Sequence, residues 1–149
     1  MAERDPDFVY VTYIKTTPEK LWDALTSPEF TRQYWFGIAV TSDWKVGSVM
    51  TYRQGGKTVV DGKVLVADRP RLLSYTFRES NGEASHEPPT RVTIELEPEK
   101  GTETVRLTVT HTDFVINSKH RPSISTGWPA VQSGLKSLLE TGKPLAFEE

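Results

Sequence analysis

The chain of 149 residues contains no cysteine, only two methionines and only three histidines. Without cysteine there can be no disulfide, no thiolate metal site and no cysteine nucleophile, and the chain suits a reducing compartment. Three histidines leave little material for a histidine-based metal site. We therefore expect no metal, no bound cofactor and a cytoplasmic location.

Long apolar runs and a one-sided charge are also missing. The first seven residues carry four charged side chains and no apolar stretch, so we expect neither a signal peptide nor a membrane span. Basic and acidic residues number 18 and 20, which gives a net charge of −2, and the basic residues are scattered singly. Nucleic-acid-binding proteins normally show a clustered basic stripe, so we set that class aside.

Catalytic and phosphate-binding motifs are absent as well. The segment 56–58 (Gly-Lys-Thr) looks like the end of a phosphate loop, but Thr51 stands where that motif needs glycine. His86 and Glu87 are followed by two prolines, which exclude the helical zinc motif built from two histidines. No Gly-x-Ser-x-Gly nucleophile elbow occurs. The sequence therefore gives no support to hydrolase chemistry, and we name no catalytic residue.

The strongest pattern that is present is a helix signal near the C-terminus, over 126–142. Proline at 129 fits a first helical turn, where its missing amide is tolerated, and glycine at 142 fits a left-handed stop just past the last turn. The predicted helix is roughly 23 Å long, enough to cross a small sheet. The apolar residues that recur on one stripe of it are Trp128, Val131, Leu135, Leu138 and Leu139.

Most of the remaining chain has the composition of strands. Residues 8–14 are β-branched or aromatic almost throughout, which favours a strand with both faces at least partly covered. Two short helices are indicated at Thr17-Pro18-Glu19 and Ser27-Pro28-Glu29, where a capping hydroxyl precedes a proline at the first helical position. Six further strands, separated by turn signals, are expected near 38–42, 48–53, 57–67, 71–78, 90–97 and 103–114.

Two of these strands show which face of the sheet is apolar. In each of them, aliphatic residues alternate with charged or hydroxyl residues, as expected for a sheet with one covered and one solvated face. The C-terminal helix is the only predicted element long enough to cover the apolar face. The aliphatic residues that define this face are Val92, Ile94, Leu96, Val105, Leu107 and Val109.

The helix run at 128–143 (WPAVQSGLKSLLETGK) and the segment 17–29 (TPEKLWDALTSPE) resemble a known family. It is the START-like family homologous to the activator of the ninety-kilodalton heat-shock chaperone ATPase, in the Bet v 1-like (SRPBCC) superfamily. The resemblance implies an α+β helix-grip fold, in which a curved antiparallel β-sheet wraps around a long C-terminal α-helix and two short helices follow the first strand. We expect one domain over 8–144, with tails at 1–7 and 145–149.

The resemblance leaves three functions open, because relatives with this fold include lipid carriers, polyketide cyclases, plant ligand binders and co-chaperones. The first is a small soluble protein that binds a hydrophobic or amphipathic small molecule, aromatic ones included, in a cavity between helix and sheet. The second is a co-chaperone-like regulator of a heat-shock chaperone ATPase. The third is a cyclase or dehydratase-type enzyme acting on a polyketide-like substrate. We expect a monomer or a homodimer.

Among titratable residues, His111 has the most informative position. It continues the inward register of Val105, Leu107 and Val109, with Asp113 next, so we expect a dry, neutral imidazole that offers one donor and one acceptor to a ligand. A histidine already satisfied by a backbone or hydroxyl group is the alternative. The candidate cavity residues are Tyr75, Phe77, Val92, Ile94, Leu107, Val109, His111, Trp128, Val131, Gln132 and Leu135.

Overall fold

The computed structural model describes residues 3–145. These residues form seven strands, three α-helices and one short 3-10 helix. Five of the six strands predicted after residue 37 agree with the observed ones to within about one residue at each end. In chain order the elements are β1 (Phe8–Lys15), α1 (Pro18–Thr26), α2 (Pro28–Tyr34), β2 (Ala39–Thr41), β3 (Val49–Gln54), β4 (Lys57–Asp68), β5 (Leu72–Glu79), η1 (Glu83–His86), β6 (Thr90–Pro98), β7 (Thr104–Thr112) and α3 (Arg121–Thr141).

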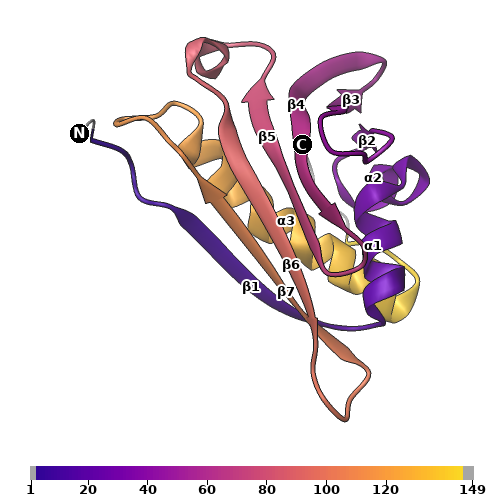
Figure 1. Ribbon diagram of the computed structural model, residues 1–149. Helices are drawn as coiled ribbons and strands as arrows, with labels where there is room; N and C mark the ends of the chain where they lie inside the picture. The colour runs from indigo at the N-terminus through magenta and orange to yellow at the C-terminus, as the bar shows by residue number, and fades with distance from the viewer. Residues whose placement is uncertain (1–2, 146–149) are drawn as a thin grey trace.

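All seven strands join one antiparallel sheet in the order β1-β7-β6-β5-β4-β3-β2. Irregular pairings between Tyr52 and Arg53 in β3 and between Val64 and Val66 in β4 bend the strands. The resulting sheet curls, and α3 crosses its concave side (Figure 1). This is the predicted α+β helix-grip fold, a curved antiparallel sheet wrapped around a long C-terminal helix.

The apolar stripe of α3 is buried as predicted, but the helix is longer than predicted. Leu135 has no exposed surface, and Trp128 and Val131 are 5% and 3% exposed. The helix begins at Arg121, so Pro122 occupies the first turn and Pro129 lies inside the helix. The prediction that Pro129 marks the first turn is therefore wrong. The extra turns bury Ile124, and burying a large aliphatic side chain offsets part of the cost of roughly 3 kcal/mol for an interior proline.

The predicted stop of α3 is confirmed. Gly142 has φ of 83°, in the left-handed region, and its amide donates to the carbonyl of Leu138 at 2.9 Å. This geometry satisfies one of the carbonyls that the end of a helix leaves without a partner.

The first short helix has the predicted cap and the second does not. The hydroxyl of Thr17 accepts from the amide of Lys20 at 3.3 Å at the start of α1. Ser27 instead donates its hydroxyl to the Glu29 carboxylate at 2.6 Å, and it makes no side-chain cap at the start of α2. The amide of Ser27 also ends α1, where it donates to the carbonyl of Asp23. One serine thus connects the two helices.

The first strand differs from the prediction, because only one of its faces is covered. Val9, Val11 and Tyr13 are 46–56% exposed. The reason is that α3 packs on the concave face of the sheet, and no described element packs on the outer face of β1. The strand also forms one edge of the sheet, because it pairs with β7 alone. Side chains of α3 partly cap this free edge, as Lys136 Nζ donates to the Tyr13 carbonyl at 2.6 Å and Glu140 accepts from the Lys15 amide at 2.8 Å.

Replacing Leu135 by alanine should lower the free energy of unfolding by about 2–5 kcal/mol, because it opens a cavity between α3 and the sheet. Lys136→Ala is the matched control one residue on. Its exposed contacts with Tyr13 and Glu140 should be worth less than about 1 kcal/mol. Chemical denaturation of both variants measures the difference. Equal losses would contradict the burial of this stripe.

Candidate functional site

A cavity of about 130 Å³ lies beside the first half of α3. Helix α3 contributes one wall, the end of α2 a second, and strands β3 to β5 a third. The polar residues of the lining are Glu79, His120 and Ser123. The large apolar or aromatic residues of the lining include Trp35, Tyr52, Phe77, Ile124, Trp128 and Val131.

Aromatic rings pack edge to face in this wall. The ring centroids of Trp35 and Trp128 are 5.4 Å apart, those of Trp35 and Tyr52 5.0 Å, and those of Tyr52 and Phe77 5.4 Å. Such contacts add stability beyond the area that they bury. Ser123 is exposed, and Phe36 and Gly127 are half-buried, so the cavity opens to solvent along this side of α3.

Behind the wall, the hydroxyls of Tyr52 and Tyr75 share a short hydrogen bond. Burial raises the pKa of both phenols, so neither ionises near neutral pH. The pair therefore acts as neutral hydroxyls, which is the form that packs at least cost in an apolar core.

His111 points inward as predicted, but both of its ring nitrogens are bonded within the protein. The indole Nε1 of Trp128 donates to Nδ1 at 3.1 Å, and Nε2 lies 2.7 Å from Oγ1 of Thr90. An indole can only donate, so Nδ1 must be unprotonated and Nε2 must carry the hydrogen. The Thr90 hydroxyl in turn donates a hydrogen bond to the carbonyl of Phe77 at 3.0 Å.

The expectation that His111 offers a free donor and acceptor to a ligand is therefore wrong. The imidazole has no exposed surface, and it matches the alternative of a satisfied histidine bonded to a hydroxyl. Burial lowers the pKa of His111, and the nearby His120 lowers it further, from 6.5 to about 3 in all. This is the predicted direction. Asp113 does not face it, because β7 ends at Thr112 and Asp113 turns away with φ of 72° to pair with Arg4 at 2.9 Å.

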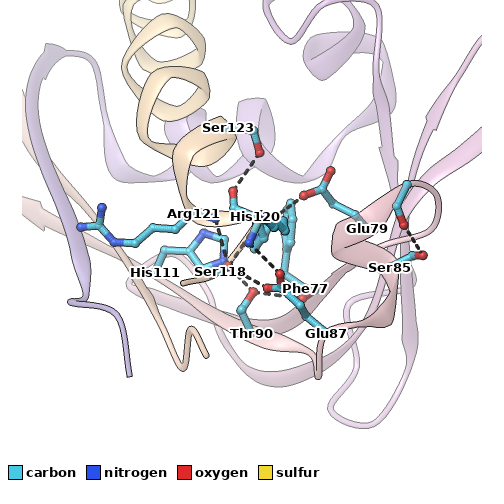
Figure 2. A network of polar contacts seen from close by, with 12 residues as sticks. Phe77, Glu79, Ser85, Glu87, Thr90, His111, Ser118, His120, Arg121 and Ser123 are labelled. Atoms are coloured by element: carbon cyan, nitrogen blue, oxygen red, sulfur yellow. Dashed lines mark hydrogen bonds and ion pairs between the residues drawn. The ribbon is translucent and has the colours of Figure 1, made fainter. Parts of the chain in front are cut away.

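The structure brings a different histidine to the cavity, one that no sequence pattern indicated. His120 is 3% exposed, and its Nδ1 is hydrogen-bonded to the carboxylate of Glu79 at the end of β5 (Figure 2). Its ring stacks on Phe77 with centroids 4.9 Å apart. Its Nε2 is buried and has no hydrogen-bond partner among the described residues.

The segment before α3 holds His120 in place through buried and half-buried polar contacts. The Ser118 hydroxyl accepts from the amide of His120 at 3.0 Å and donates to Glu87 at 2.7 Å (Figure 2). Glu87 also accepts from the amide of Lys119, and Asp5 accepts from the amide of Ser118. Two carboxylates far apart in the sequence therefore fix the start of the helix.

Of the eleven candidate cavity residues, Phe77, Trp128 and Val131 line the cavity. The other eight are buried but do not line it. Gln132 is 2% exposed, and its Oε1 accepts from Thr12, while its Nε2 has no partner in the described part of the chain. Whether any of the eleven contacts a ligand stays a prediction.

No group of three or more histidine or carboxylate side chains within residues 3–145 could hold a metal ion. No helix among these residues is both long and apolar enough to cross a membrane.

A curled antiparallel sheet closed around a C-terminal helix, with a cavity between them, defines the helix-grip class of the Bet v 1-like superfamily. Within this class the chain belongs to the family described as Activator of Hsp90 ATPase homolog 1-like protein, whose sequence pattern matches residues 15–140. No curated protein matches the chain.

Many solved structures share the fold. The solution structure of the Aha1 dimer from Colwellia psychrerythraea has a TM-score of 0.76 and 22% identity, over 93% of this chain and 99% of that one. A protein from Cytophaga hutchinsonii has a TM-score of 0.72 and 27% identity, over 94% and 97%. An HSP90 activator from Plasmodium falciparum has a TM-score of 0.71 and 17% identity, over 89% and 92%.

The buried His111 should make the protein less stable in acid. The unfolded chain binds a proton at this histidine near pH 6.5, whereas the folded chain binds it only near pH 3. Stability should therefore fall as the pH drops from 6.5 towards 3, by up to about 1.4 kcal/mol per pH unit. Urea denaturation of the wild type and of His111→Gln between pH 4.5 and 8 measures this slope.

The wild type and His111→Gln retain the same carboxylates. The difference between their slopes of stability against pH therefore comes from His111. The exposed His86, changed to glutamine, is the matched control and should keep the wild-type slope. A His111→Gln variant with the wild-type slope, or a His111 that titrates near 6.5 by NMR, would contradict the assignment.

Proposed function

We propose that this protein binds a small apolar or amphipathic molecule in the cavity between α3 and the sheet. The observation that carries the proposal is the composition of the cavity wall, which is mostly aromatic and aliphatic with His120 and Glu79 as buried or half-buried polar members. Small-molecule sites are generally concave and apolar, with a few polar groups that orient the ligand.

The size of the cavity limits the ligand. Its volume of about 130 Å³ is close to that of an engineered apolar cavity of about 150 Å³ that binds benzene. It is smaller than the range of about 300–1,000 Å³ typical of sites for drug-sized molecules. The part of the ligand inside the protein is therefore about the size of one six-membered ring, and a sterol or flavonoid would require the cavity to widen.

A second candidate is a co-chaperone-like role. It is favoured by the family description and by the exposed apolar row on β1, formed by Val9, Val11 and Tyr13. Side chains of this kind on a sheet edge can contact another protein. The two candidates use different parts of the molecule, so one set of variants separates them.

Ring-sized apolar compounds such as toluene and indole should raise the melting temperature of the protein. A ligand present at a hundredfold its dissociation constant, and bound only by the folded state, stabilises by about 2.7 kcal/mol. Gly127→Leu should abolish this shift. A Cβ at Gly127 meets no heavy atom within 4 Å, so a side chain added at this cavity-lining position can occupy the space. Differential scanning calorimetry measures both effects.

Thr126→Leu is the matched control, because this neighbouring residue is exposed and does not line the cavity. It should keep the shift. Absence of any shift across single-ring compounds, fatty acids, sterols, flavonoids and polyketides would defeat the binding proposal. If the same protein then stimulated a purified heat-shock chaperone ATPase, and Val11→Lys removed that stimulation, the second candidate would stand in its place.

A further inference from the structure

Two buried side-chain atoms in residues 3–145 have no hydrogen-bond partner, and one belongs to a residue of the cavity wall. This atom is Nε2 of His120; the other is Nε2 of Gln132, which does not line the cavity. A buried polar atom left without a partner costs roughly 1–3 kcal/mol. In native structures such an atom usually has a partner, which is a protein group, an ordered water or a bound molecule.

The carboxylate of Glu79 fixes the role of this nitrogen. An ionised carboxylate can only accept a hydrogen bond, so Nδ1 of His120 must carry the hydrogen that joins the two residues. In the neutral ring, Nε2 is then a lone-pair acceptor, and the carboxylate behind the ring makes it a stronger one. While the ring is neutral, the group that satisfies Nε2 must therefore be a hydrogen-bond donor.

The neighbouring hydroxyls of the protein do not serve as that donor. Ser123 donates to the backbone carbonyl of His120 at 2.8 Å, and Ser118 donates to Glu87 at 2.7 Å (Figure 2). Thr90 donates to the carbonyl of Phe77. The other groups in contact with the ring are the aromatic rings of Phe77, His111 and Phe114. Because His120 lines the cavity, a partner for Nε2 can enter from there.

We infer that the ligand of this cavity is a small hydroxylated ring compound, such as a phenol, whose hydroxyl donates a hydrogen bond to Nε2 of His120. The inference rests on the proposed function, in which a ring-sized molecule occupies the cavity. It adds that this molecule carries a hydroxyl group. The apolar part of the ring lies against Trp128 and Val131, and the Glu79 carboxylate acts indirectly by holding the imidazole.

The experiment compares p-cresol with toluene, because the two share a ring and a methyl group and differ only by the hydroxyl. Calorimetric titration at pH 8, above the usual titration range of histidine, should show p-cresol binding roughly 3- to 10-fold more tightly, as expected for one added hydrogen bond. In His120→Phe the preference should vanish while toluene still binds. His86→Phe, an exposed histidine away from the cavity, is the matched control and should keep the preference.

Nitrogen-15 NMR of the wild type gives an independent readout that needs no variant. Nε2 of His120 should be the unprotonated ring nitrogen at pH 8, and its resonance should move on addition of p-cresol but not of toluene. A resonance that p-cresol leaves unchanged would mean that water alone satisfies the atom, which would overturn the inference.

The outcomes separate this inference from the proposed function. If toluene binds but p-cresol binds no more tightly, or if His120→Phe keeps the preference, the hydroxyl inference is wrong and cavity binding stands. If Nε2 of His120 carries a hydrogen at pH 8, the hydroxyl inference is likewise wrong and cavity binding stands. If neither compound binds, the proposed function fails and the inference fails with it.

Discussion

The burial of α3 against the concave face of the sheet is the contact on which the other features depend. An isolated helix with two internal glycines and a proline would be marginal in water. Its stability comes from large side chains such as Trp128 and Leu135, each worth roughly 1.5–3 kcal/mol when removed from water. The same contact closes the sheet and creates the cavity beside the first half of the helix.

The packing of α3 on the sheet also buries polar groups, and these groups differ in how fully their hydrogen bonds are satisfied. His111 is enclosed in a chain of donors and acceptors that runs from Trp128 to Thr90 and leaves no nitrogen unused. This arrangement is structural, since it joins α3 to β6 and β7. His120 has one nitrogen bonded to Glu79, and the other has no partner within residues 3–145. The two neighbouring histidines therefore differ, since both nitrogens of His111 are bonded within the protein and only one nitrogen of His120 is.

Local pattern explains why much of the interior could be predicted. The alternation in β6 and β7 indicated that Val92, Ile94 and Leu107 face inward, and all three are buried. The same alternation failed at Asp113, because a residue with positive φ ended the strand register. The residue pattern of β1 also led to a wrong prediction, that both of its faces are covered. Its outer apolar residues are exposed because no described element packs on that face.

The sequence by itself determined the strands and the α-helices apart from the start of α3, their order, the stop at Gly142 and the inward direction of His111, because each depends on residues close together in the chain. Only the tertiary structure decided which histidine meets the cavity. His120 and Glu79 are 41 positions apart, and they meet because the start of α3 lies beside the end of β5. The cavity likewise depends on how side chains from several elements fill a shared space, and no local periodicity encodes the volume they leave empty.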